Sequence, residues 1–209
     1  MNKNALLIFD FDGTIADTLH SLIAIYNRLA DELGFKKIEA DEISKLQDNS
    51  IQETLKYLNI PLLKFPMIVA KAKKALHNEI ERINPIDGLK DILKQFKSLG
   101  FKMGILSSNS LKNVTEFLKN NDLDLFDFIH TTSKIWSKNH SLKMLMNKKQ
   151  LNCSQVIYIG DETRDIIAAQ KAGICSVAVT WGYNSCKALE AHHPDHLIHS
   201  PQELLQLFH

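Results

Sequence analysis

Residues 5–14 read ALLIFDFDGT, an apolar run that is followed at once by two aspartates on a short polar turn. The run Ala5–Phe9 lacks alternating polar residues, which is typical of a strand covered on both faces of a parallel sheet. In sheets of this kind, ligands bind beyond the carboxyl ends of the strands. We therefore expect Asp10 and Asp12 to lie at the ligand-binding edge of a sheet.

The same pattern recurs later in the chain, where short apolar runs alternate with helical spacing. Further strands are expected at Met103–Leu106, Phe128–His130, Val156–Ile159 and Cys175–Val179. Helices are expected between them at Leu89–Leu99, Leu111–Asn120, His140–Lys149 and Thr163–Ala172. Gly100 and Gly173 follow two of these helices, where a left-handed residue often ends a helix. This alternation predicts an α/β fold with a Rossmann-like, doubly wound parallel sheet.

The segment after the first strand departs from this rhythm. Helical spacing is found at Leu19–Leu33, Ile51–Leu58 and Phe65–Ile83. Ser50 and Glu53 have the spacing of a capping box, and Asp17 is expected to begin the first of these helices. We therefore predict an all-helical cap domain at residues 17–84, inserted into an α/β core domain that consists of residues 1–16 and 85–209.

The composition narrows the class of protein. The chain has 209 residues, of which 44% are hydrophobic, and a formal net charge of +1. These values suit a packed core and argue against disorder and against a dedicated nucleic-acid binder. Three cysteines without a CxxC pair make a poor disulfide framework or zinc site. No run approaches the roughly 18 apolar residues of a membrane span. We expect a cytoplasmic protein with no membrane partner, either a monomer or a homodimer.

Acidic residues follow two of the expected strands. Asp161 and Asp165 come after the fourth strand, so the sheet edge would gather them near Asp10 and Asp12. Four crowded carboxylates repel one another, and a divalent cation relieves that repulsion. Hard oxygen ligands without a cysteine or a histidine pair favour Mg²⁺. Of the two aspartates on the first turn, one can be a nucleophile and the other a general acid and base.

Anion-binding residues are expected at the same edge. Ser107 and Ser108 end the second strand, and the amides at the start of the next helix can hold an anion. Lys138 can neutralise phosphate as a compact point charge, with Lys134 and Lys143 as alternatives for this role. A nucleophile, an acid, a metal and an anion site together meet the needs of phosphoryl transfer.

These motifs resemble a known family. DFDGT at 10–14, the serine after the second strand, a downstream lysine and GDETRD at 160–165 look like the four motifs of the haloacid dehalogenase superfamily. The helical insertion, the stretch GDETRDIIAAQKAG at 160–173 and VTWGY at 179–183 resemble its phosphoglycolate phosphatase-like branch. By this resemblance, Asp10 would form an aspartyl-phosphate, and Asp12 would protonate the leaving alcohol and then activate water.

The resemblance also implies ligand sets for phosphate and metal. Residues implied to bind the substrate phosphate are Ser107, Ser108, Lys138, Gly13 and Thr14, with Gly13 allowing a sharp turn. Residues implied to ligate Mg²⁺ are Asp10, Asp12 through its backbone carbonyl, Asp161 and, directly or through water, Asp165. An acid at position 12 favours phosphoryl chemistry over dehalogenation, because dehalogenases of this family lack it.

Three functions stay open at this point. The first is a Mg²⁺-dependent phosphatase of small phosphate monoesters, such as phosphoglycolate-like compounds or sugar phosphates. The second is a phosphomutase of the same fold, and the third is a non-catalytic module that binds a phosphometabolite. Residues 46–50, LQDNS, occupy a region where relatives often carry Arg-Gly, which argues against phosphoglycolate itself.

Overall fold

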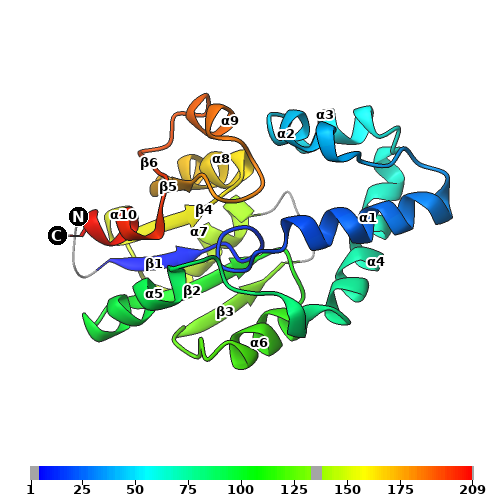
Figure 1. Cartoon of the computed structure of the whole chain (residues 1–209). Coiled ribbons are helices and arrows are strands. Elements are labelled where there is room, and N and C mark those ends of the chain that lie inside the picture. The colour runs from blue at the N-terminus through cyan, green and yellow to red at the C-terminus, as the bar shows by residue number, and fades with distance from the viewer. Residues whose placement is uncertain (1–4, 133–137, 209) are drawn as a thin grey trace.

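The computed structural model describes residues 5–132 and 138–208. Its centre is a six-stranded parallel sheet in the order β3-β2-β1-β4-β5-β6 (Figure 1). The strands are β1 (Leu6–Phe9), β2 (Lys102–Ser107), β3 (Phe128–Thr131), β4 (Val156–Gly160), β5 (Cys175–Val179) and β6 (His196–Ile198). The predicted α/β fold with a doubly wound parallel sheet is confirmed.

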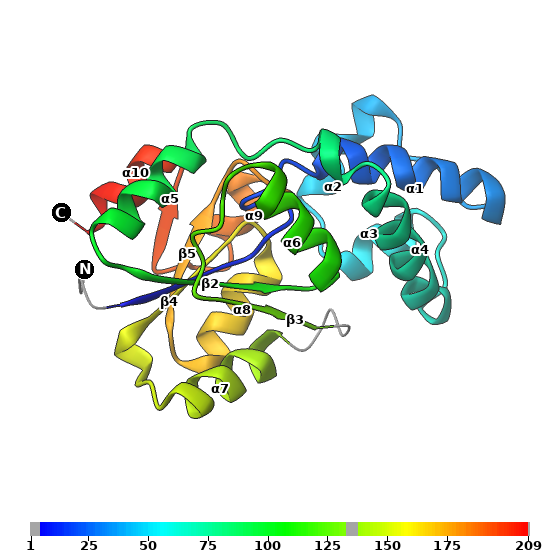
Figure 2. The same cartoon turned by 90° about the horizontal axis from the view of Figure 1, so that it is seen from below.

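Helices cover both faces of this sheet. They are α5 (Leu89–Ser98), α6 (Leu111–Asn120), α7 (Lys138–Lys149), α8 (Thr163–Ala172), α9 (Cys186–Glu190) and α10 (Pro201–Gln206). Figure 2 shows α5, α6 and α10 on one face and α7 and α8 on the other. Side chains of β1 alternate accordingly: Leu7 and Phe9 pack in one apolar cluster, and Leu6 and Ile8 pack in another. Because both faces of β1 are buried, its sequence shows no polar alternation.

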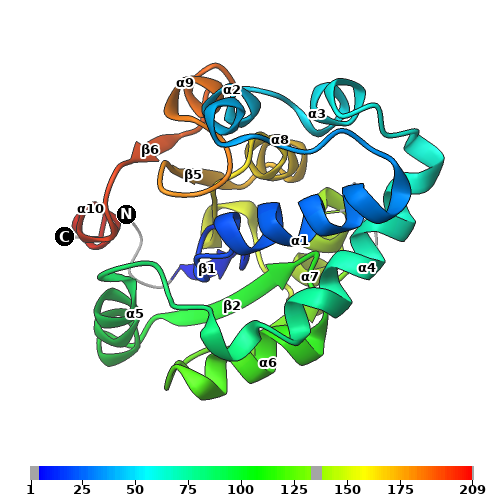
Figure 3. The ribbon, with the colours of Figure 1, turned by 45° about the vertical axis from the view of Figure 1, so that its right-hand side comes forward.

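A helical layer connects β1 to α5. It contains α1 (Leu19–Leu33), α2 (Ile43–Gln47), α3 (Ile51–Tyr57) and α4 (Phe65–His77), with 3₁₀ turns at Ala40–Glu42, Leu62–Lys64 and Ile80–Arg82. We call these elements the inserted helices. Figures 1 and 3 show them grouped beyond one end of the sheet, next to the loops that follow its strands.

The ends of the inserted helices agree in part with the sequence patterns. The capping box before α3 is confirmed, because Glu53 N donates to Ser50 Oγ at 3.3 Å and Ser50 N donates to Glu53 Oε2 at 2.8 Å. The expectation that Asp17 begins α1 is wrong, since Thr18 occupies the N-cap position. Helix α4 is shorter than predicted: the chain tightens into a 3₁₀ turn and then extends toward Pro85, which a helix cannot pass.

Two chain crossings join the inserted helices to the sheet, and they lie side by side. Asp17 N donates to the carbonyl of Asn84 at 3.0 Å, and Ile86 N donates to the carbonyl of Ile15 at 2.9 Å. Ala16 forms an isolated antiparallel bridge with Pro85. The inserted helices are therefore anchored immediately beside the turn that follows β1.

Some short elements of the structure were not predicted from the sequence, whereas two predicted helix ends are present. Strand β6 and helices α2, α9 and α10 were not predicted, because each is short and gains its order from packing. Gly100 and Gly173 have φ angles of 83° and 73°, which confirms their left-handed position after α5 and α8. Within the described ranges, the structure contains no helix with the length and apolar content that a membrane crossing requires.

Candidate active site

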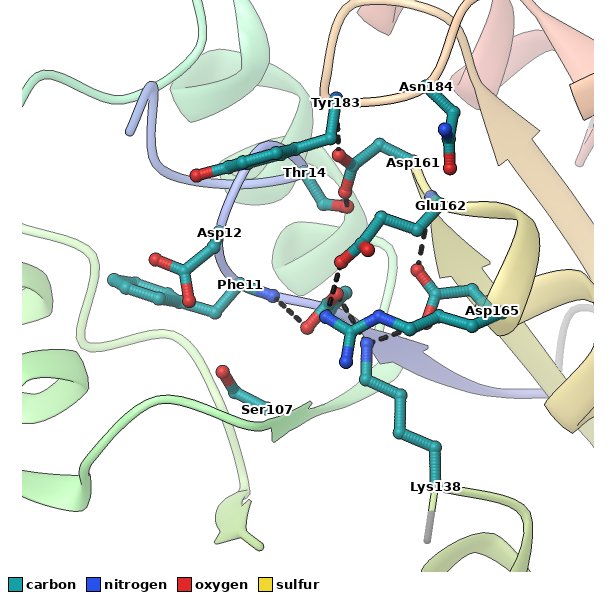
Figure 4. A network of polar contacts seen from close by, with 12 residues as sticks. Phe11, Asp12, Thr14, Ser107, Lys138, Asp161, Glu162, Asp165, Tyr183 and Asn184 are labelled. Carbon is teal, nitrogen blue, oxygen red and sulfur yellow. Dashed lines mark hydrogen bonds and ion pairs between the residues drawn. The ribbon is translucent and has the colours of Figure 1, made fainter. Parts of the chain in front are cut away.

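Lys138 lies within a polar cluster at the carboxyl edge of the sheet (Figure 4), where it forms a buried ion pair with Asp10. Asp10 follows β1 and is 2% exposed, and its Oδ1 accepts a hydrogen bond of 2.8 Å from Phe11 N. Lys138, the first residue of α7, forms an ion pair with Asp10 Oδ2 and another, at 2.6 Å, with Asp165 Oδ1. Burial alone would lower the pKa of Lys138, but the charges of Asp10 and Asp165 raise it above its usual value.

The structure distinguishes the three candidate lysines. Lys138 is 2% exposed and lies against Asp10, whereas Lys143 is exposed on α7. Lys134 lies outside the described residues. Of the two described lysines, Lys138 is therefore the one in a position to meet a phosphate beside Asp10.

Asp161 lies fully buried after β4, between the first turn and the loop that follows β5. Its Oδ1 accepts a 2.5 Å hydrogen bond from Thr14 Oγ1, and its Oδ2 accepts a 2.7 Å hydrogen bond from Tyr183 N. Burial and the neighbouring Glu162 and Asp10 raise the pKa of Asp161 well above its usual value. Its two named partners carry no charge, so this carboxylate lacks the compensation that Lys138 gives to Asp10.

Two glycines allow the backbone to approach Asp161 closely. A Cβ atom added to Gly13 or to Gly182 would overlap Asp161 Oδ2. Gly13 also has a φ angle of 76°, which L residues rarely adopt. Of the residues expected to bind phosphate, Gly13 and Thr14 thus surround Asp161, and the hydroxyl of Thr14 is directed to its carboxylate.

Asp12 is held by a residue that the sequence patterns did not indicate. Asn109 Nδ2 donates to Asp12 Oδ1 at 2.9 Å and to Oδ2 at 3.1 Å. Burial and the charge of Asp10 raise the pKa of Asp12 to about 7, although hydrogen bonds from Asn109 and Thr18 oppose this rise. A carboxyl group with this pKa can both donate and accept a proton near neutral pH.

Ser107 and Ser108 lie at the end of β2, close to the start of α6. Ser107 is fully buried, and its Oγ accepts a hydrogen bond of 2.9 Å from Asn109 N. Ser108 is half-buried. The side chain of Ser110 caps α6 by accepting from Asn113 N. The structure thus brings Ser107 to the same edge as Asp10, Asp12, Asp161 and Asp165, as expected.

Glu162 and Arg164 complete the cluster and were not singled out from the sequence. They form an ion pair with each other. One carboxylate oxygen from each of Asp10, Glu162 and Asp165 lies within 4.8 Å of the other two. Burial and the charge of Asp10 raise the pKa of Asp165 to about 7, although Lys138 opposes this. The one sequence signal for Glu162 is its position between Asp161 and Asp165. An acidic residue at that position is equally compatible with an exposed loop and with a functional site.

A cation from the inserted helices also approaches this edge. Lys73 on α4 is half-buried, and burial lowers its pKa while the charge of Asp12 partly counteracts that effect. The carbonyl of Lys73 accepts a 3.0 Å hydrogen bond from Asn113 Nδ2. The sequence does not indicate this approach, because Lys73 and Asp12 lie far apart along the chain.

The donor set of the cluster fits a hard divalent cation. Carboxylate oxygens of Asp10, Glu162 and Asp165 lie close enough together to share one ion, and Lys138 is already paired with Asp10 and Asp165. Burial raises the pKa of Asp161 well above its usual value, so a bound cation would favour its carboxylate form. Oxygen ligands without a thiolate suit Mg²⁺.

Comparison with known proteins agrees with this geometry. The sequence model of the haloacid dehalogenase-like hydrolases matches residues 7–179, and the chain belongs to this family. Over 201 residues it is 34% identical to a phosphoglycolate phosphatase from Synechococcus elongatus, covering 96% of this chain and 95% of that protein. It is also 22% identical over 205 residues to a pyrophosphatase from Bacillus mycoides, covering 96% and 95% of the two chains.

The fold has counterparts among solved structures. A haloacid dehalogenase-like hydrolase from Streptococcus pneumoniae superposes with a TM-score of 0.84 at 22% identity, over 100% of both chains. These comparisons confirm the family resemblance that the motifs indicated. They also confirm the predicted enzyme class, a phosphoric monoester hydrolase of the haloacid dehalogenase family.

Proposed function

We propose that this protein is a Mg²⁺-dependent phosphatase that hydrolyses small phosphate monoesters through a covalent intermediate on Asp10. The observation that carries the proposal is the pairing of a buried Asp10, held by Lys138 and Phe11 N, with Asp12, whose pKa is about 7. Asp10 lies where a carboxylate oxygen could attack a phosphate bound beside Lys138. Asp12, with a pKa of about 7, can give a proton to the leaving alcohol near neutral pH.

Each step can be assigned to a residue of the chain. A carboxylate oxygen of Asp10 attacks phosphorus, the bond from phosphorus to the ester oxygen breaks, and Asp12 gives its proton to the leaving alcohol. Asp12, now ionised, takes a proton from water as that water attacks the phosphoryl group. The bond between Asp10 and phosphorus then breaks, which regenerates Asp10 and releases inorganic phosphate.

Charge stabilisation falls to the remaining members of the cluster. Lys138, which contacts Asp10, and Ser107, which ends β2, would bind phosphoryl oxygens together with the adjacent Ser108. Asp10, Asp161 and the carbonyl of Asp12 would hold Mg²⁺, with Asp165 in support. When bound, the ion would neutralise phosphate charge and hold the substrate in line with Asp10.

The same proposal divides the chain into two functional parts. Residues 1–16 and 85–209 would form the catalytic core, and residues 17–84 would form a cap domain. The side-by-side crossings at Asp17 and Asn84 support these boundaries. The cap would exclude water and read the leaving group.

The test is phosphate release from p-nitrophenyl phosphate and from a panel of phosphate monoesters, with Mg²⁺ and with a chelator. We expect Asp10→Asn to lower turnover by about 10³-fold or more. The matched control is Asp17→Asn, an exposed acid near the same turn, which should retain wild-type turnover. Undiminished turnover in Asp10→Asn would refute the covalent mechanism, and isomer formation with little phosphate release would identify a phosphomutase.

A further inference from the structure

A large cavity opens between the inserted helices and the core. Its volume is about 570 Å³, and its core side includes Lys138, Glu162, Arg164 and Tyr183. Lys138 lines the cavity and also contacts Asp10, so the cavity borders the candidate active site. Its volume falls within the range of sites that hold ligands much larger than a two-carbon acid.

The wall contributed by the inserted helices is mainly apolar. Helix α1 supplies Leu22 and Ile23, α2 supplies Leu46, and α3 supplies Ile51 and Leu55. All but Leu55 are only half-buried, so they present apolar surface to the cavity. Half-buried aliphatic side chains on a concave wall beside a catalytic centre favour contact with an apolar ligand group.

Several polar groups in the wall are engaged with other parts of the protein. The hydroxyl of Tyr183 lies 3.1 Å from Thr18 Oγ1, and Ser50 Oγ donates to Glu53 at 2.7 Å. Asn184 Nδ2 donates to the carbonyl of Gln47 at 2.9 Å. The bonds of Tyr183 and Asn184 join the core to the inserted segment, and the bond of Ser50 caps α3, so these three groups are engaged within the protein and aliphatic side chains make up most of the remaining wall.

We propose that the substrate is a phosphate monoester with a large apolar leaving group, an alkyl or aryl chain that occupies this cavity while its phosphate meets Asp10. The inference deepens the proposed function and rests on it. A two-carbon polar leaving group would leave most of the cavity to water and would cover little of the aliphatic surface of Leu22 and Ile51. Each buried methylene, in contrast, strengthens binding about fourfold.

The first experiment measures kcat/KM with Mg²⁺ for n-alkyl phosphates from ethyl to octyl and for 2-phosphoglycolate. We expect an increase of about fourfold per added methylene until the cavity is filled, with octyl phosphate far above both ethyl phosphate and 2-phosphoglycolate. Leu22→Ser and, independently, Ile51→Ser should flatten this dependence. The matched control is Leu63→Ser, because Leu63 is 95% exposed on the cap and is outside the cavity wall.

A second experiment separates the cavity from catalysis. Calorimetric titration with n-alkylphosphonates, whose C–P bond this mechanism does not break, should show the same increase in affinity with chain length. Chain-length-dependent binding without phosphate release from any ester would support the cavity and overturn the proposed function. Phosphate release with a flat chain-length dependence, or with 2-phosphoglycolate preferred over octyl phosphate, would overturn the apolar leaving group and leave the proposed function intact.

Discussion

Replacement of Asn109 by alanine should move the pH dependence of catalysis without removing the chemistry. Asn109 Nδ2 donates to both carboxylate oxygens of Asp12, at 2.9 and 3.1 Å, and so stabilises the ionised form of Asp12. A hydrogen bond to a charged group contributes about 1.5–3 kcal/mol. Since one pKa unit corresponds to about 1.4 kcal/mol, its loss should raise the pKa of Asp12 by about 1–2 units.

The sign of the effect on rate follows from the proposed role of Asp12 as proton donor in the first step. The value of kcat/KM reports the free enzyme and should fall as the pH rises above the pKa of the donor. The basic limb of the profile should therefore lie about 1–2 pH units higher in Asn109→Ala than in the wild type. Both enzymes would be compared at the same Mg²⁺ concentration, so the effect of the ion on Asp12 is common to them.

The assay is kcat/KM for p-nitrophenyl phosphate from about pH 5 to about pH 10. Asn113→Ala is the matched control, because Asn113 bonds to Asn109 Oδ1 and not to Asp12. Ser110 N still donates to Asn109 Oδ1 at 2.7 Å, so Asn109 keeps its orientation in that variant and the limb should not move. A folded Asn109→Ala enzyme whose basic limb stays in place, or moves to lower pH, would refute the reasoning.

Three further predictions concern Mg²⁺ binding and the attachment of the inserted helices to the core. Gly182→Ala should push Asp161 from its position and weaken Mg²⁺ binding by about 10- to 100-fold in a calorimetric titration; unchanged affinity would place the ion elsewhere. Because the pKa of Asp165 is raised to about 7, the folded state favours its protonated form, and stability without metal should decline from about pH 4 to about pH 7. Saturating Mg²⁺ should therefore raise the unfolding temperature more at pH 8 than at pH 5 in scanning calorimetry, and an equal increase at both would contradict this. Asn184→Ala removes two hydrogen bonds to the carbonyls of Gln47 and Asn49, so amides at residues 46–50 should exchange with solvent about tenfold faster, whereas unchanged exchange would show that these bonds do not hold the inserted helices against the core.

The parts of the site that the sequence predicted are those fixed by position on the sheet. Asp10 and Asp161 directly follow buried strands that are adjacent in the sheet, so their proximity follows from the rule for parallel strands. Asp12 and Asp165 lie within a few residues of them, on the turn after β1 and in the first turn of α8. For these four residues, the local sequence pattern and the order of the strands are sufficient to predict that they lie at one edge of the sheet.

The parts that the sequence did not predict depend on contacts between distant segments. Asn109 is 97 positions from Asp12, and an asparagine after a strand is an ordinary turn residue unless its partner is known. The sequence pattern places Lys73 on the surface of a helix. Its interaction with the charge of Asp12 depends on how α4 packs in the folded protein. Arg164 and Glu162 carry opposite charges and form an ion pair with each other. Together they add no net charge to this part of the sequence, so charge alone does not indicate that they belong to a functional cluster.

Hydrogen bonds connect the inserted helices to the surroundings of Asp12 and Asp161. Asn113 donates at 3.0 Å to the carbonyl of Lys73 on α4 and also at 3.0 Å to Asn109, which holds Asp12. Asn184 donates to the carbonyl of Gln47, while its own amide N donates at 3.2 Å to the carbonyl of Asp161. A movement that lifts the inserted helices would break the bonds to Lys73 and to Gln47. Asn109 would keep its hydrogen bond from Ser110 N, and the Asp161 carboxylate would keep those from Thr14 and Tyr183 N, so the contacts that hold the polar cluster together do not depend on the position of the inserted helices.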